Sequence, residues 1–329
     1  MGTVHILFML FCYDGVKGAM HMNISIKQTV SKYRYLVLIL VFFSVLTVAI
    51  TTQNEVPYNR IAIHMGSAHI YWYAIFIMTG ILLAVFYART ELENIGYDPN
   101  ILYDGLIIGL PLAILGARIY YVLFDPMPHY QNFIDVINIT RGGLAIHGAI
   151  ITTVIFVWIY AKKKKIQLSP LLDILVVGLL IGQIVGRFGN FMNHEAYGPM
   201  IQSDWVFKVI PNFILIQMTD SGVTHHPTFL YEGLWNLSLV IFLLSIKSKK
   251  VFREGDFLGL YLIWYGLGRA LIIEPMRIQG AVGDALMFMG LPMNVIMSLI
   301  FVIIGIIYLY LKHNLRLSIK MLVLRKARF

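Results

Sequence analysis

The sequence predicts an all-α protein, a polytopic membrane helix bundle with seven core transmembrane helices and one extra N-terminal apolar segment. Three observations support this fold class. Of the 329 residues, 58% are hydrophobic and only 13% are charged, which is unlike a soluble globular domain. Eight apolar runs are long enough to span, or nearly span, a bilayer. The basic residues are also distributed very unevenly among the segments that join these runs.

The apolar runs set the domain organisation. The first run follows Lys27, Lys32 and Arg34, a pattern typical of a signal anchor or a signal peptide. We therefore expect residues 1–53 to be an N-terminal extension, and residues 54–329 to form the membrane-embedded domain with a basic cytoplasmic tail. The eight runs cover residues 35–52, 72–90, 105–124, 143–160, 171–190, 229–246, 257–275 and 292–311.

The basic residues predict the orientation. With the N-terminus inside, the inner segments hold 19 of the 26 Lys and Arg residues, and the outer segments hold four. Lys and Arg accumulate in cytoplasmic loops, so we expect a cytoplasmic N-terminus. The net charge of +9 then reflects membrane topology, and we expect no nucleic-acid partner. The single cysteine, Cys12, excludes a disulfide within the chain and a cysteine-based metal cluster.

The remaining three basic residues, Arg118, Arg187 and Arg269, fall inside apolar runs. At a rise of 1.5 Å per residue they lie roughly 18 to 24 Å from the cytoplasmic ends of their helices, in the outer half of the membrane. One buried arginine is explained equally well by a structural ion pair. Several charged groups at one depth indicate a functional site, and arginine favours phosphate. The other polar side chains expected near this level are Tyr73, His147, Glu232 and Glu274.

The motif GRFGNFMNHEAYG at 186–198 concentrates polar groups where an apolar run ends. Its structural interpretation is a helix end capped by Asn and Gly, with Arg187 extending toward the interface. The motif RGGLAIHG at 141–148 places His147 about one turn into the membrane. Such a histidine is usually a satisfied core group, but it is also the usual general base near neutral pH. His225 and His226 have no further ligand at suitable spacing, so we expect no metal and no cofactor.

These motifs resemble the bacterial prolipoprotein diacylglyceryl transferase family over residues 55–312. GARIYYVLF at 116–124, HPTFLYEG at 226–233 and YGLGR at 265–269 follow the family's order, together with the two motifs above. The resemblance implies a seven-helix transferase that moves the diacylglyceryl group of phosphatidylglycerol to the lipobox cysteine thiol of prolipoproteins, releasing glycerol phosphate. It implies a multi-pass protein of the bacterial cytoplasmic (inner) membrane, with the active site toward the outer leaflet.

The expected catalytic residues are His147, Arg187 and Arg269. The expected substrate-binding residues are Tyr73, Arg118, Asn190, Asn193, Glu195, Gly198 and Glu232. The expected partners are phosphatidylglycerol, prolipoprotein signal peptides and the lipid bilayer. A transporter or flippase for anionic phospholipids is the alternative, but it requires polar access from both faces, whereas the inner halves of the helices are nearly unbroken apolar sequence.

The sequence departs from the family pattern at three places. Residues 1–53 lie outside the similar region, and Gly148-Ala149 follows His147 where the family commonly has two glycines. The family usually spaces its late arginine and acid as R-x-x-x-E, but Arg269 and Glu274 are five positions apart. At about 100° per residue, this spacing predicts that Glu274 lies roughly 140° around the helix from Arg269.

Overall fold

The computed structural model describes residues 24–53, 57–66, 68–124, 132–139, 142–247, 252–280, 287–288 and 290–326. Cys12 and Arg141, which the sequence analysis singles out, lie outside these residues. The chain divides into two compact units, Met1–Thr47 and Val48–Phe329. Helix α2 (Ile24–Thr51) provides the described part of the first unit, and its stretch Leu38–Thr51 is the predicted extra apolar segment.

Seven helices of the second unit are long and apolar enough to cross a membrane, counted over the described residues. The predicted bundle of seven core helices is therefore confirmed. The last but one continues without a break through a π-helical turn, η1 (Arg269–Ile273), into α12 (Glu274–Gly280). The seven are α3 (Trp72–Asn94), α4 (Asn100–Phe124), α6 (Ile146–Lys164), α7 (Leu168–Asn193), α10 (Thr228–Ile246), α11 (Asp256–Gly268) and α13 (Met293–Lys326).

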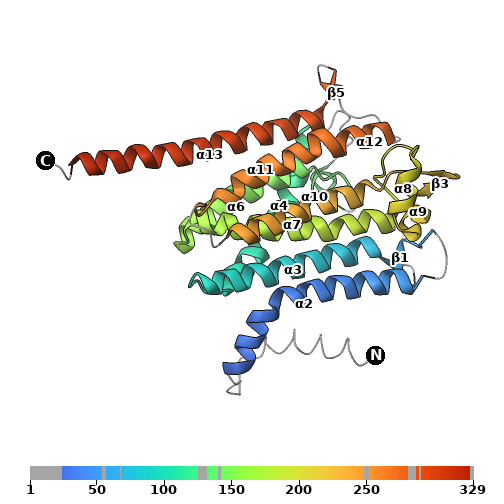
Figure 1. Ribbon diagram of the computed structural model, residues 1–329, viewed down its shortest axis with the longest axis horizontal. Coiled ribbons are helices and arrows are strands. Elements are labelled where there is room, and N and C mark those ends of the chain that lie inside the picture. The colour runs from blue at the N-terminus through green and yellow to red at the C-terminus, as the bar shows by residue number, and fades with distance from the viewer. Residues whose placement is uncertain are drawn as a thin grey trace. The chain divides into compact units, whose positions relative to one another are not determined.

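Short elements connect the long helices. Within the second unit, β1, α8, α9 and β3 gather at the same end of the helices as α12 (Figure 1). Among the residues that the structure describes, three two-stranded antiparallel hairpins are formed by β1 with β2, β3 with β4 and β5 with β6. The bounds are β1 (Ile61–Met65), β2 (Ala68–Tyr71), α5 (Phe133–Ile137), α8 (Asp204–Val209), α9 (Asn212–Gln217), β3 (Thr219–Asp220), β4 (Val223–Thr224), β5 (Met287–Phe288) and β6 (Leu291–Pro292).

Glycines allow close contact between pairs of helices. A Cβ atom added to Gly148 of α6 would lie 2.2 Å from the carbonyl oxygen of Gly116 in α4. A Cβ added to Gly266 of α11 would lie 2.5 Å from the carbonyl oxygen of Ser298 in α13. Only a residue without a side chain fits such positions, and small residues are the usual means of helix association in a bilayer. The helices therefore pack as close pairs, α4 with α6 and α11 with α13.

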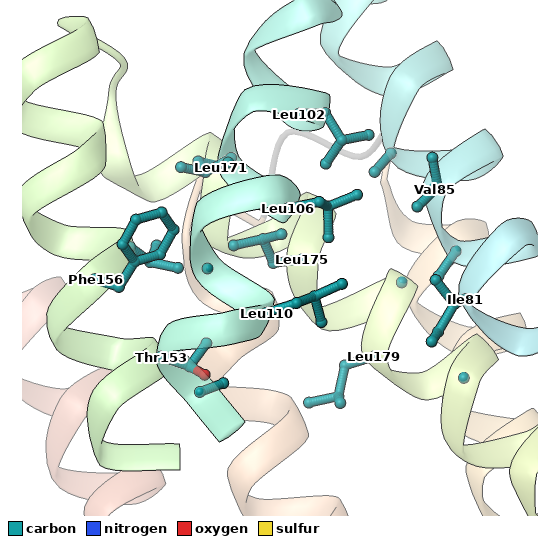
Figure 2. Close-up of a pocket in the computed structure, with 18 of the residues that line it drawn as sticks. Ile81, Val85, Leu102, Leu106, Leu110, Thr153, Phe156, Leu171, Leu175 and Leu179 are labelled. Carbon is teal, nitrogen blue, oxygen red and sulfur yellow. The ribbon is translucent and has the colours of Figure 1, made fainter. Parts of the chain in front are cut away.

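An apolar cavity of about 590 Å³ separates α3 and α7 from α4 and α6 (Figure 2). Aliphatic side chains such as Val85, Leu106 and Leu175 point into it from three of these helices. The polar side chains in its wall are Thr153, Tyr160 and Gln183. A space of this size and character suits a hydrocarbon chain.

Candidate active site

The C-terminal end of α7 orients Arg187. The helix ends at Asn193, and His194 takes a left-handed backbone conformation with φ of 60°. Within the last two turns, Arg187 Nη1 donates to Asn190 Oδ1 at 3.3 Å, and Asn190 Nδ2 donates to Glu195 Oε1 at 2.9 Å. The helix end is therefore capped at His194, and not by Asn or Gly as the sequence suggests. The motif also forms a chain of hydrogen bonds that fixes the guanidinium.

Glu232 of α10 is the centre of the polar cluster. Its side chain is only 1% exposed, and its carboxylate accepts three guanidinium groups. Oε1 lies 2.6 Å from Nη2 of Arg187, and Oε2 lies 3.1 Å from Nη1 of Arg269 and 3.2 Å from Nη2 of Arg277. Residues from α7, α10, η1 and α12 thus converge on one buried carboxylate.

The predicted 140° offset of Glu274 from Arg269 is wrong. The backbone N–H of Glu274 donates to the carbonyl of Arg269, five residues earlier, because Arg269–Ile273 forms a π-helical turn. Such a turn returns a residue five positions on to the same side of the helix. Glu274 forms an ion pair with Nη2 of Arg269, and Asn294 Nδ2 donates to the second carboxylate oxygen of Glu274 at 3.4 Å. Glu274 consequently belongs to the cluster.

Arg277 also belongs to the cluster, although the orientation count places it in an outer segment. Its guanidinium reaches Glu232, and its Nε is buried with no hydrogen-bond partner among the described residues. The sequence indicates the inward turn of Arg277 by its spacing from Glu274, because residues three apart lie on one face of a helix. An unpartnered buried N–H is costly, so the ion pair with Glu232 is the contact that holds Arg277 in the cluster.

The cluster has more positive than negative charge. Its three arginines and two glutamates leave one net positive charge, and each guanidinium is less than one-fifth exposed, at 16–19%. Electrostatic attraction is stronger in such a water-poor site than at the surface. Planar guanidinium forks match phosphate geometry. This arrangement is therefore suited to binding a phosphate-bearing anion.

A stacked pair of tyrosines connects the cluster with the apolar cavity. The ring of Tyr265 lies 6.0 Å from the guanidinium carbon of Arg269, and Tyr261 stacks on Tyr265 with centroids 5.3 Å apart. The hydroxyl of Tyr261 accepts from Gln183 Nε2 at 2.9 Å, and Gln183 lines the cavity. The anion site and the apolar cavity are therefore connected by the side chains of Tyr265, Tyr261 and Gln183.

Arg118 holds the segment between α4 and α6. It is 6% exposed, and its Nε and Nη2 each donate to a carbonyl at 2.7 Å, those of Val136 and Asp135. Its Nη1 donates at 3.0 Å to the carbonyls of Gly142 and Gly143. The guanidinium thus ties both flanks of the connection that leads into α6.

His147 and Tyr73 come from two further helices. His147 is the second residue of α6, is half-buried, and lies with its ring 5.8 Å from that of Tyr120. Tyr73 of α3 packs its ring on Gly189 of α7, where an added Cβ would come within 2.7 Å of the ring. Gly189 is therefore the residue that lets Tyr73 lie against the Arg187 segment.

The end of the motif at 186–198 is fixed by the residues just before α10. Gly198 donates its N–H to the carbonyl of His226 at 2.8 Å and accepts from His225 Nδ1 at 2.9 Å. Burial lowers the pKa of His226, which favours its neutral form. Asn193 has a buried Oδ1 without a hydrogen-bond partner in the described part of the chain. Gly198 therefore anchors the end of the motif.

Together these features define a polytopic membrane protein with a buried, arginine-rich anion site beside an apolar cavity. A model of the family prolipoprotein diacylglyceryl transferase matches residues 60–311. The chain is 40% identical over 258 residues to the phosphatidylglycerol–prolipoprotein diacylglyceryl transferases of Bacillus cereus strain 03BB102 and Bacillus thuringiensis subsp. konkukian strain 97-27. Each alignment covers 78% of this chain and 93% of the relative. The chain belongs to the prolipoprotein diacylglyceryl transferase family.

The π-helical turn should tolerate the loss of one residue. Deletion of Leu271, which is 68% exposed, should convert the turn to α-helix and leave Arg269 and Glu274 four positions apart, still on one face. Thermal unfolding of the purified variant should therefore stay close to that of the wild type.

A control deletion of Leu262, inside α11, rotates the later residues by about 100° and should break the buried pairs. We expect it to lower the unfolding temperature by on the order of 10 °C. Equal destabilisation by both deletions would contradict this account of the turn.

Proposed function

We propose that the protein transfers the diacylglyceryl group of phosphatidylglycerol to the lipobox cysteine thiol of prolipoprotein signal peptides. A bond forms between the cysteine sulfur and the terminal glyceryl carbon. The bond from that carbon to the phosphate oxygen breaks, and glycerol phosphate leaves with the electron pair. The observation that carries the proposal is the net positive cluster on Glu232, in a member of this family.

The arginines act on the leaving group. Negative charge grows on the phosphate as the carbon–oxygen bond breaks, and fixed guanidinium groups in a dry site stabilise that charge without reorganising. Arg187 and Arg269 supply charge and paired N–H donors, while Glu232 holds them in place. Asn190 and Glu195 orient Arg187 through their hydrogen-bond chain. The cavity beside α4 accepts an acyl chain of the lipid (Figure 2).

The other site residues handle the thiol and the peptide. His147 takes the thiol proton, since a thiol with a pKa near 8.5 is mostly protonated at neutral pH. Arg118 acts as a positioning residue for His147, because it ties the segment that leads into α6. Tyr73, Asn193 and Gly198 line or support the substrate site next to Arg187. The site faces the outer leaflet of the bacterial cytoplasmic membrane, in keeping with the distribution of basic residues.

Incubation of the purified full-length protein with phosphatidylglycerol and a lipobox peptide tests the proposal. A thioether-linked diacylglyceryl peptide and free glycerol phosphate should accumulate in equal amounts. A peptide whose cysteine is replaced by serine is the control, and it should remain unmodified. Movement of lipid between leaflets of a reconstituted vesicle, without thioether formation, would identify a transporter instead.

Arg187 should be an electrostatic catalyst. Arg187→Ala should insert and fold but lose at least about a hundredfold in turnover, the effect of removing a donor aimed at developing charge. Arg187→Lys should recover little, because an ammonium group cannot reproduce the bidentate fork. Initial rates of transfer, normalised to folded protein by size-exclusion chromatography, measure the effect. Turnover close to the wild-type value in folded Arg187→Ala would assign Arg187 to structure alone.

His147 should show its role in the pH dependence. His147→Gln keeps a hydrogen-bonding group of similar size but removes the base. The variant should lose most activity at low pH and regain part of it as the pH approaches about 8.5, where the thiol ionises unaided. The measurement is kcat for both proteins from about pH 6 to about pH 9, a range that extends past the thiol's own pKa of about 8.5. A loss of the same size at every pH would mean that His147 moves no proton.

A further inference from the structure

The hairpin of β1 and β2 immediately precedes the first core helix. Its strands pair in antiparallel register, with Ile63 opposite Ile70 and His64 opposite His69. Directly paired residues lie on the same face of a hairpin, and successive residues lie on opposite faces. One face therefore carries Ile63 and Ile70, and the other face carries both histidines.

The two histidines are close and accessible. Their ring centroids are 5.0 Å apart, the ring planes are inclined by 77°, and both residues are exposed. A nitrogen–metal bond of about 2.0–2.1 Å puts a metal ion roughly 3.2 Å from each ring centroid. Centroids 5.0 Å apart then subtend about 100° at that ion, close to the tetrahedral angle of about 109°. The observed spacing is already that of a chelating pair.

We infer that His64 and His69 form a binding site for a divalent transition-metal ion on the exposed face of the hairpin. Neutral imidazole is a good ligand for Zn²⁺, Cu²⁺ and Ni²⁺, and Cu²⁺ binds most tightly in this series. Among the described residues, no three His, Cys, Asp or Glu side chains come together to hold a metal. Water consequently completes the coordination, and the ion exchanges with the medium.

The ion would act as a clamp on the hairpin. It would join two strands that are otherwise held by backbone pairing around a short turn at Gly66. The backbone beyond β2 passes directly into α3, where the N–H of Trp72 donates to the carbonyl of Arg60 at 3.0 Å. The clamped strands therefore lie next in sequence to Tyr73. The site is separate from the proposed transfer chemistry, which draws on neither histidine.

Copper binding to the tag-free, full-length protein tests this inference. The protein is placed in phosphatidylcholine nanodiscs, because anionic headgroups would themselves bind the ion. Isothermal titration with Cu²⁺ should give one site per chain, and electron paramagnetic resonance should show two equatorial nitrogen ligands. Zn²⁺ should compete for the same site and displace the copper only when it is in large excess. Hydrogen exchange of the hairpin amides should slow when the metal is bound.

Two variants and one control decide the result. His64→Gln and His69→Gln should each weaken Cu²⁺ binding by about a hundredfold or more, because two-point attachment becomes one-point attachment. Both side chains are exposed, so the variants should fold normally. His226→Gln, in the adjacent pair His225-His226, should bind copper like the wild type. Wild-type affinity in His64→Gln or His69→Gln, or loss of binding in His226→Gln alone, would overturn the inference.

Discussion

The ion pairs of the buried Glu232 carboxylate hold the site together. The carboxylate accepts guanidinium groups from α7, η1 and α12, and so it fixes three elements relative to α10. Three arginines so close together repel one another strongly in a water-poor environment. Removing one partner of a buried ion pair typically costs 3–5 kcal/mol. The same contact that assembles these helices also leaves the positive charge that suits a phosphate.

The π-helical turn makes this arrangement possible. It brings Glu274 beside Arg269, and it allows Arg277 to reach Glu232 from the next turn. The helix before it is held by a reciprocal contact, in which the indole N–H groups of Trp235 and Trp264 each donate to the other's carbonyl. The rings of these tryptophans stack with centroids 4.5 Å apart. This packing on the N-terminal side of the π-helical turn supports a local departure from α-helical geometry at the site. Such π-helical turns frequently occur at functional sites.

The fold was predictable from the sequence because a bilayer permits few spanning structures. Long apolar runs must become helices, since their backbone groups can be satisfied only internally. Part of the site was also predictable, because an arginine inside an apolar run, such as Arg187 or Arg269, rarely lacks a function. The proximity of Glu274 to Arg269 was not predictable, because it depends on an inserted residue that a constant 100° per residue does not represent. The spacing of Glu274 and Arg277 indicates the inward turn of Arg277 only once Glu274 is placed in the cluster. The partners of Arg118 are backbone carbonyls of α5 and of the residues before α6, and the pattern of polar side chains in the sequence does not reveal backbone carbonyls.

In the proposed reaction, the surplus positive charge of the Glu232 cluster binds the phosphate. Isothermal titration calorimetry at one salt concentration can compare the affinity of glycerol phosphate for the wild-type protein and for Arg277→Gln. The substitution removes the surplus charge and leaves Arg187 and Arg269 on Glu232. A hydrogen bond to a charged group contributes about 1.5–3 kcal/mol, so glycerol phosphate should bind the variant at least about tenfold more weakly. An unchanged dissociation constant in a folded Arg277→Gln variant would mean that the surplus charge does not bind the phosphate.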